Sequence, residues 1–124
     1  MNWIAVFLGG GLGSMTRYGI GLWALSFSSG HFPWGTFISN LASSFILGLI
    51  SGFFANRPDS MMTFKLLAAA GFCGGFSTFS TFSAETFELI RNGYTAMAFL
   101  NAGANLAGTF LMMASGFWLT RITA

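Results

Sequence analysis

Long apolar stretches separated by three short polar segments make up almost the whole chain. The polar segments run from Ser26 to His31, from Asn56 to Ser60 through Pro58, and from Arg91 to Gly93. A helix needs about 20 mostly apolar residues to cross a bilayer, and each stretch between these segments reaches that length. The pattern predicts an all-α membrane protein in one domain, 1–124, with spans at about 3–27, 34–55, 62–90 and 94–119.

The third stretch has the most unusual pattern, because glycines and hydroxyls interrupt it midway. From Gly71 to Ser83 it reads Gly-Phe-Cys-Gly-Gly-Phe-Ser-Thr-Phe-Ser-Thr-Phe-Ser. Paired glycines, here Gly74 and Gly75, weaken a helix, and the Ser and Thr that follow offer hydroxyls to freed backbone groups or to a ligand. We therefore expect this helix to be broken near residues 74–81. In hydrocarbon such a break is tolerated only inside protein or beside a wet cavity.

Two tracks of polar side chains follow the helical period along the second and fourth stretches. Spaced by four residues, they are Thr36, Asn40 and Ser44 in the second stretch and Asn101, Asn105 and Thr109 in the fourth. Residues four apart lie on one helix face, and polar groups on an apolar helix need partners. Hydrogen bonding between helices and the lining of a pore both explain these tracks, and the two can hold together.

Composition agrees with a membrane protein. The chain is 54% hydrophobic and only 6% charged, with a mean hydropathy of +0.70, whereas soluble domains carry about 25% charged residues. A net charge of +2 is too small to indicate a nucleic-acid partner. The single Cys73 excludes an internal disulfide and a multi-cysteine metal site. The amino-terminal residues lack the basic region and cleavage site of a signal peptide.

Charged residues are few, and their positions bear on topology. Arg17 lies inside the first span, where a charge is costly; it either reaches the interface along its own stem or forms the positive wall of a vestibule. With four spans, three basic residues fall on one side of the membrane, namely Arg57, Lys65 and Arg121. The other side has one or two, namely Arg91 and, depending on its depth, Arg17. Such a weak bias does not fix orientation. The sequence therefore allows insertion in both directions, and our hypothesis is an antiparallel dual-topology homodimer, resembling an inverted repeat.

The chemistry available near the expected break suits an anion. The spans carry no carboxylate before Glu85, although cation filters use carboxylates or rings of carbonyls. Hydroxyls and amides can donate hydrogen bonds, and the edges of aromatic rings are positive. Phe79 and Phe82 are three residues apart, which places their rings on one helix face. A small hydrated anion could exchange its water for such donors and ring edges.

Three motifs in order resemble the small bacterial fluoride channels of the CrcB family, and the resemblance covers nearly the whole chain. They are Gly-Gly-Gly-Leu-Gly-Ser-Met-Thr-Arg-Tyr in the first span, Pro-Trp-Gly-Thr-Phe-Ile-Ser-Asn at the start of the second, and the run from Gly71 to Glu85. The resemblance implies passive fluoride export across the inner membrane through two pores of a dual-topology dimer.

The resemblance also implies roles for individual residues. For the fluoride pathway these are Phe79 and Phe82 as ring-edge ligands, Asn40 as the pore amide, Thr78, Ser80 and Thr81 at the break, and Asn101, Asn105 and Thr109 along the fourth helix. It places Arg17 and Glu85 in a vestibule, and the backbone carbonyls of Gly74 and Ser77 on a structural sodium ion at the dimer interface. The chain departs from the family at Ser43, at Ser77 and in the two asparagines of the fourth helix.

Other functions fit the sequence less well. A small dual-topology proton-coupled exporter of toxic cations needs a carboxylate in its first span, and residues 3–27 contain none. An assembly subunit that transports nothing would use the same polar residues only to join helices. An enzyme is not indicated, because no nucleophile, base and orienting group converge in the sequence.

Overall fold

The computed structural model describes residues 1–57 and 59–123 and is all-helical over that part of the chain; Pro58, assigned above to a polar segment, lies outside the described residues. Its elements are α1 (Asn2–Leu25), α2 (Trp34–Phe54), η1 (Asp59–Met61), α3 (Met62–Lys65), the π-helix η2 (Leu66–Cys73), α4 (Gly74–Phe76), α5 (Phe79–Arg91) and α6 (Thr95–Thr123). The all-helical prediction is confirmed. The elements from α3 to α5 follow one another in line and are called the third rod below.

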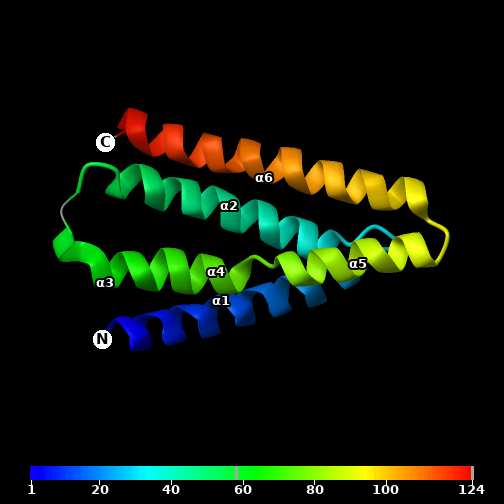
Figure 1. The fold of residues 1–124 in the computed structure, drawn as a ribbon, viewed down its shortest axis with the longest axis horizontal. Coiled ribbons are helices and arrows are strands. Elements are labelled where there is room, and N and C mark those ends of the chain that lie inside the picture. Colours follow the sequence, from blue (N-terminus) through cyan, green and yellow to red (C-terminus); the bar gives the residue numbers. More distant parts are fainter. Residues whose placement is uncertain (58, 124) are drawn as a thin grey trace.

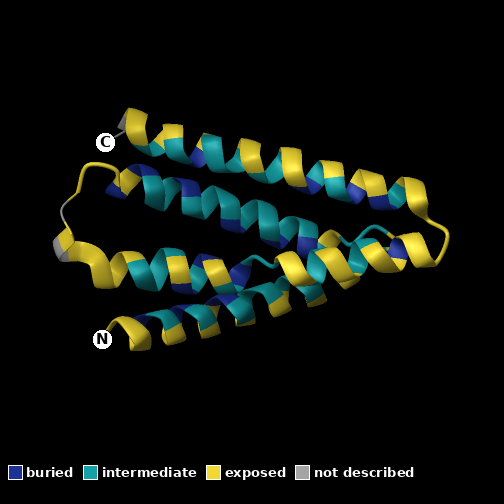
Figure 2. Ribbon diagram, in the orientation of Figure 1, coloured by how far each residue is buried: buried dark blue, intermediate teal, exposed yellow. Residues whose placement is uncertain are grey.

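Four long rods lie side by side in two main pairs (Figure 1). In one pair α2 packs along α6, and in the other α1 packs along η2 and α4. The two pairs join where α1 contacts α2 and where α5 contacts α6. Both termini and the connection between α2 and η1 lie at one end of the bundle, called here the terminal end, and the two other connections lie at the opposite end. The buried residues follow the faces where the rods meet (Figure 2).

Three of the rods are long and apolar enough to cross a membrane among the described residues, namely Trp34–Phe54, Met62–Arg91 and Thr95–Ile122. The start of α2 at Trp34 directly follows Pro33, as expected from a residue that suits the beginning of a helix. Helix α1 has 24 residues, which at about 1.5 Å per residue is also long enough to span hydrocarbon. Arg17 is the one charged residue within this helix.

The contact between α1 and the third rod is made by glycines on both sides. A Cβ atom added at Gly13 would lie 2.1 Å from the carbonyl oxygen of Phe72, and one added at Gly9 would lie 2.2 Å from that of Leu67. From the other side, a Cβ at Gly75 would lie 2.4 Å from the carbonyl oxygen of Gly10. Small residues spaced by four allow membrane helices to touch through their backbones. The glycine-rich run of the first span therefore serves helix packing.

The third rod leaves the helical conformation at Ser77 and Thr78. Ser77 has φ −85° and ψ 157°, and Thr78 has φ −151° and ψ 125°. The paired glycines lie before this point and are helical, since Gly74 has φ −64° and ψ −38° and Gly75 belongs to α4. The prediction that the glycines open the backbone is therefore wrong. Gly75 is needed for its close approach to α1, and the extended residues are the hydroxyl-bearing pair that follows.

Candidate functional site

Two helix ends meet at the interruption, and the side chain of Thr78 caps the second. Thr78 is the residue before α5, and its Oγ1 accepts a hydrogen bond from the backbone N–H of Thr81 at 3.2 Å. Such a cap satisfies one of the free N–H groups at the start of a helix. The start of α5 also carries the partial positive charge of the helix dipole. The local electrostatics here favour a negative group.

The interruption leaves the four carbonyl groups of residues 74–77 without their usual helical donors. In a continuous helix the N–H of Thr78 would bond to Gly74 and that of Thr81 to Ser77. Here the N–H of Thr78 donates to Oδ1 of Asn40 at 3.0 Å, and the N–H of Thr81 donates to Thr78 Oγ1. Gly74 is exposed, and Ser77 is half-buried. The carbonyl oxygens of Gly74 and Ser77 are the two that the family resemblance associates with a sodium ion.

Arg17 satisfies a third carbonyl in the same turn. Its Nε donates to the carbonyl oxygen of Gly75 at 3.2 Å, a group that would accept from Phe79 in a continuous helix. A cation at the carboxyl end of a helix also interacts favourably with the dipole. Arg17 therefore binds the end of α4, a structural role that the sequence analysis did not foresee.

Asn40 of α2 bridges both main-chain groups of Thr78. Its Oδ1 accepts from the N–H of Thr78, and its Nδ2 lies 3.4 Å from the carbonyl oxygen of the same residue. The Nδ2 also donates to Oδ1 of Asn105 on α6 at 3.2 Å. An amide nitrogen carries two hydrogens, so both are directed at protein acceptors. Asn40 stabilises the extended conformation at Thr78 and joins the third rod to α6.

The hydrogen bonds continue from Asn105 in one direction across α6 to α5. Nδ2 of Asn105 donates to Oδ1 of Asn101 at 2.8 Å, and Nδ2 of Asn101 donates to Oγ1 of Thr86 at 2.9 Å. Thr86 donates in turn to the carbonyl oxygen of Phe82 at 2.7 Å. Each amide oxygen faces an amide nitrogen, so the orientation of one asparagine fixes that of the next. We call Asn40, Asn105, Asn101 and Thr86 the amide chain.

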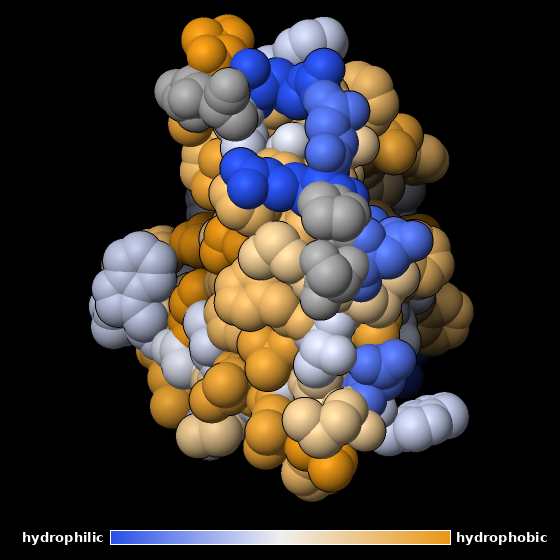
Figure 3. Space-filling view, turned by 90° about the vertical axis from the view of Figure 1, so that its left-hand side faces the viewer, coloured by the Kyte–Doolittle hydropathy of each residue, from blue (hydrophilic) through white to orange (hydrophobic). Residues whose placement is uncertain are grey.

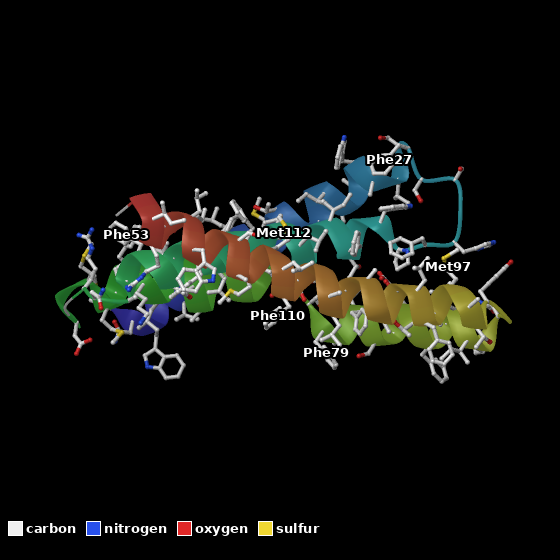
Figure 4. The ribbon with its side chains drawn as sticks, turned by 90° about the horizontal axis from the view of Figure 1, so that it is seen from above. Phe27, Phe53, Phe79, Met97, Phe110 and Met112 are labelled. Atoms are coloured by element: carbon white, nitrogen blue, oxygen red, sulfur yellow. The ribbon has the colours of Figure 1, made fainter. Side chains whose placement is uncertain are left out.

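A pocket of about 310 Å³ lies beside the interruption. Its lining residues are Asn40, Ser44, Ser77, Thr78, Phe79, Phe82, Ala102, Asn105, Leu106 and Thr109. The rings of Phe79 and Phe82 have centroids 5.7 Å apart and are tilted by 44°. Phe79 is 79% exposed in the single chain and projects from the same side of the bundle as Phe110 (Figure 4). The pocket thus combines two rings with amides and hydroxyls from three rods.

Most of the polar hydrogens around this pocket are used within the protein. Thr109 donates to the carbonyl oxygen of Asn105 at 2.6 Å, and Ser77 donates to that of Cys73 at 2.9 Å. The hydroxyls of Thr78 and Ser80 lie 3.4 Å apart, so only one of their two hydrogens is used between them. Ser44 has no hydrogen-bond partner among the described residues. The pair Thr78 and Ser80, together with Ser44, therefore holds the unused hydroxyl hydrogens.

Ser44 was part of the polar track of the second stretch, but the sequence analysis gave it no role. Its spacing of four from Asn40 was the available signal. Thr86 carried no signal in the sequence, because it belongs to neither polar track and becomes part of the amide chain only through the packing of α5 on α6. Asn101, expected along the fourth-helix pathway, is fully buried at 0% exposure and does not line the pocket.

A second pocket of about 430 Å³ contains the two residues expected in a vestibule. Arg17 and Glu85 both line it, together with Thr36. Thr36 donates to Oε1 of Glu85 at 2.8 Å, whereas Oε2 is buried and has no hydrogen-bond partner in the described part of the chain. Glu85 also lines a third pocket of about 370 Å³, which contains His31 and Glu88. Arg17, Glu85 and Glu88 thus border cavities other than the pocket at the interruption.

Comparisons with known proteins agree on one family. The family described as "CrcB-like protein, Camphor Resistance (CrcB)" matches residues 4–117. A protein of Proteus mirabilis named fluoride-specific ion channel FluC is 44% identical over 118 residues, covering 95% of this chain and 94% of its own length. Proteins of the same name from Escherichia coli and Klebsiella pneumoniae are 42% and 44% identical and are covered over 91% and 90% of their lengths. These matches extend through every rod that builds the pocket, and the chain belongs to the CrcB family.

Proposed function

We propose that this protein is a multi-pass membrane channel that conducts fluoride passively out of the cell across the inner membrane. The observation that carries the proposal is the pocket at the interruption, where the start of α5, unused hydroxyls and two phenylalanine rings border one cavity. The family relatives carry the name of a fluoride-specific ion channel. They also support a channel rather than an enzyme, in agreement with the absence of a catalytic constellation in the sequence.

The pocket can replace the water around a small anion in three ways. Hydroxyl hydrogens on the pocket are available at Ser44 and, when Ser80 is the donor between the two, at Thr78, and hydrogen bonds to an ion are stronger than those between neutral groups. The rings of Phe79 and Phe82 line the same cavity, and the edges of aromatic rings are positive. The amide dipole of the α5 start adds a fixed positive field. Thr81 takes part only through its backbone, by completing the cap.

The wide pocket beside Arg17 forms the approach to this site. The guanidinium of Arg17 attracts anions, and the carboxyl group of Glu85 lines the same pocket. Glu85 is bonded to Thr36 through one oxygen only. We assign Asn101, Asn105 and Thr109 to the support and lining of the path, with Asn105 and Thr109 on the pocket and Asn101 behind it.

We propose further that the functional unit is an antiparallel homodimer of four-span subunits, with α1 as a span and with the interruption as a functional break in the third. Phe79, which lines the pocket, is 79% exposed in the single chain, and a second copy would cover it. The terminal end has Arg57, Lys65 and Arg121, and the other end has Arg91 and, at a greater depth, Arg17, so the count of basic residues favours neither orientation strongly.

The same dimer fits a structural sodium ion. Hard cations take oxygen ligands, and the carbonyl oxygens of Gly74 and Ser77 have lost their helical donors. A Cβ added at Gly74 would meet no atom within 4 Å, so its backbone is open to a partner subunit. The carbonyl oxygens of Gly74 and Ser77 from one chain would be joined by the same two oxygens of a symmetric partner. The ion would tie the two interruptions together; it does not act on fluoride directly.

The proposal is tested by replacing the rings. Phe79→Ile and Phe82→Ile remove the positive ring edges while keeping a bulky apolar side chain. Aromatic geometry is worth about 0.5–1.5 kcal/mol, so we expect fluoride efflux from liposomes to fall roughly two- to ten-fold for each variant. Efflux is measured with an ionophore that clamps the potential and without a pH gradient, because a channel needs no proton gradient and a proton-coupled exporter does.

Phe110→Ile is the matched control. Phe110 projects from the same side of the bundle as Phe79 and is similarly exposed at 73%, but it does not line the pocket. Its efflux should equal that of the unmodified protein. Normal efflux from both ring variants, with all proteins folded, would remove the rings from the mechanism. Efflux that requires a pH gradient would contradict a channel altogether.

A further inference from the structure

An apolar groove lies at the terminal end of the bundle, away from the site described above. It has a volume of about 300 Å³ and is formed by the last turns of α2, by α3 and by the end of α6. Its lining residues are Leu49, Ile50, Phe53, Phe54, Phe64 and Thr120. Thr120 is the only polar member, and its hydroxyl is directed at the carbonyl oxygens of Leu49 and Gly116, 3.1 Å and 3.0 Å away. The groove therefore presents an apolar surface.

Two arginines gather beside the mouth of this groove. The guanidinium of Arg57 lies over the ring of Phe53, a groove residue, with its central carbon 4.2 Å from the ring centroid. Arg121 lies over Phe117 at 6.0 Å. With its amide oriented to satisfy both neighbours, Asn56 accepts from Nη1 of Arg121 at 2.8 Å. Arg121 is thereby held next to the residue that precedes Arg57.

Neither of these guanidinium groups has a carboxylate partner among the described residues. Within the described part of the chain, the ion pair is the one between Arg91 and Glu88, and it lies at the opposite end of the bundle. Figure 3 looks directly at the terminal end and shows hydrophilic side chains next to broad hydrophobic surfaces. Basic side chains at the end of a membrane helix lie at the level of the lipid headgroups. An apolar groove with an unpaired positive mouth is therefore placed where lipids are.

We propose that this groove is a binding site for one anionic phospholipid. The phosphate binds to Arg57 and Arg121, because guanidinium groups match phosphate oxygens in two-point hydrogen bonds. The part of one acyl chain nearest the headgroup lies in the groove against Phe53, Phe54 and Phe64. A zwitterionic headgroup is disfavoured, since its ammonium would meet the same two cations. The bound lipid joins α2, α3 and α6 at the end of the bundle where the chain returns from α2 to the third rod.

The site is tested by native mass spectrometry of the purified full chain with phosphatidylglycerol or phosphatidylcholine added to the micelle. We expect phosphatidylglycerol to remain bound preferentially. Arg57→Gln and Arg121→Gln should each lower its apparent affinity about five-fold, the effect of one basic residue near an anionic headgroup. Arg91→Gln, at the opposite end, is the control and should leave the affinity unchanged. Ile50→Trp fills the groove and should lower lipid binding while both arginines remain.

Further measurements separate a lipid from other occupants. Glycerophosphoglycerol, which has the headgroup without acyl chains, should bind far more weakly than the whole lipid; equal binding would reduce the site to a phosphate site and overturn the proposal. Equal retention of phosphatidylcholine, or an equal loss with Arg91→Gln, would also overturn it. A change of oligomeric state in Arg57→Gln or Ile50→Trp, without loss of lipid, would identify the groove as an interface between two copies of the chain.

Discussion

The contact between α2 and α6 has two halves of opposite character. Toward the terminal end the backbones touch, since a Cβ added at Gly48 would lie 2.2 Å from the carbonyl oxygen of Met113, and one at Gly116 would lie 2.3 Å from that of Phe45. Toward the other end Asn40 and Asn105 join the same helices through a side-chain hydrogen bond of 3.2 Å. The pocket of about 310 Å³ opens beside that second half.

The difference shows how one pair of helices supports both a tight contact and a polar cavity. In the glycine half, backbone atoms meet directly and gain dispersion energy without placing any polar side chain in lipid. In the asparagine half, side chains span the gap and must satisfy one another, because an unpaired amide in a low-dielectric interior is costly. The glycine half fixes the spacing of the helices, and the asparagine half uses that spacing to position donors around the pocket.

The largest expected effect comes from disturbing the glycine half. Gly48→Ala places a methyl group 2.2 Å from a backbone oxygen of α6, which cannot rotate away as a side chain would. We expect α2 and α6 to separate and the protein to lose about 3 kcal/mol of stability. Thermal unfolding in detergent measures this loss, and fluoride efflux should fall with the fraction of folded protein.

Gly103→Ala on α6 is the control for this change, because a Cβ there would meet no atom within 4 Å. Alanine is a better helix former than glycine by about 1 kcal/mol, so this variant should be equally or more stable than the unmodified protein. If Gly48→Ala were as stable as Gly103→Ala, the glycine half would not set the helix spacing, and the comparison of the two halves would lose its basis.

A second, smaller effect is expected from the asparagine half. Asn40→Asp keeps the acceptor for the N–H of Thr78 but directs a second oxygen at the carbonyl of Thr78 and at Oδ1 of Asn105. Acceptors would then face acceptors, at a cost of about 2 kcal/mol, and a carboxylate would repel the anion. We expect efflux to fall at least about ten-fold, the factor that about 1.4 kcal/mol produces.

Asn2→Asp is the matched control for the same chemical change. Asn2 is exposed, and its Oδ1 accepts from Thr63 Oγ1 at 3.2 Å, a bond that aspartate also accepts. Efflux from this variant should be normal. Normal efflux from Asn40→Asp would mean that the side chain only joins helices, which is the alternative that the sequence left open for the polar tracks.

Much of the fold could be predicted from the sequence because lipid imposes strict rules on it. The lengths of the apolar stretches and the position of Pro33 placed the helices within a few residues, since every backbone group in hydrocarbon must be bonded internally. The spacing of four in the polar tracks predicted that Asn40 and Ser44 share one face of α2 and that Asn105 and Thr109 share one face of α6, and all four residues line the pocket. These are properties of single helices, which a sequence pattern records directly.

Features that depend on two helices meeting could not be predicted in this way. Gly74 and Gly75 weaken an isolated helix, yet the packing of Gly75 against Gly10 keeps them helical, and the extended residues are those whose N–H groups find side-chain acceptors in Asn40 and Thr78. The bond from Arg17 to Gly75 and the contribution of Thr86 likewise come from neighbouring rods. Sequence spacing along one helix contains no information about which face meets a partner.

The smallest expected effect is that of Ser44→Ala, which tests whether the hydroxyl of Ser44 contacts the ion or only helps to form the pocket wall. Ser44 lies one turn from Asn40 on the pocket wall and is not part of the amide chain, so Ser44→Ala should leave stability within about 0.5 kcal/mol. If its hydroxyl donates to fluoride, efflux should fall about five-fold, the equivalent of one hydrogen bond of about 1 kcal/mol. Ser51→Ala is the control, since Ser51 is half-buried on the same helix and does not line the pocket. Equal efflux from both variants would leave the Thr78 and Ser80 pair as the hydroxyl donor, whereas a loss confined to Ser44→Ala would extend the ion path along α2 toward the glycine half.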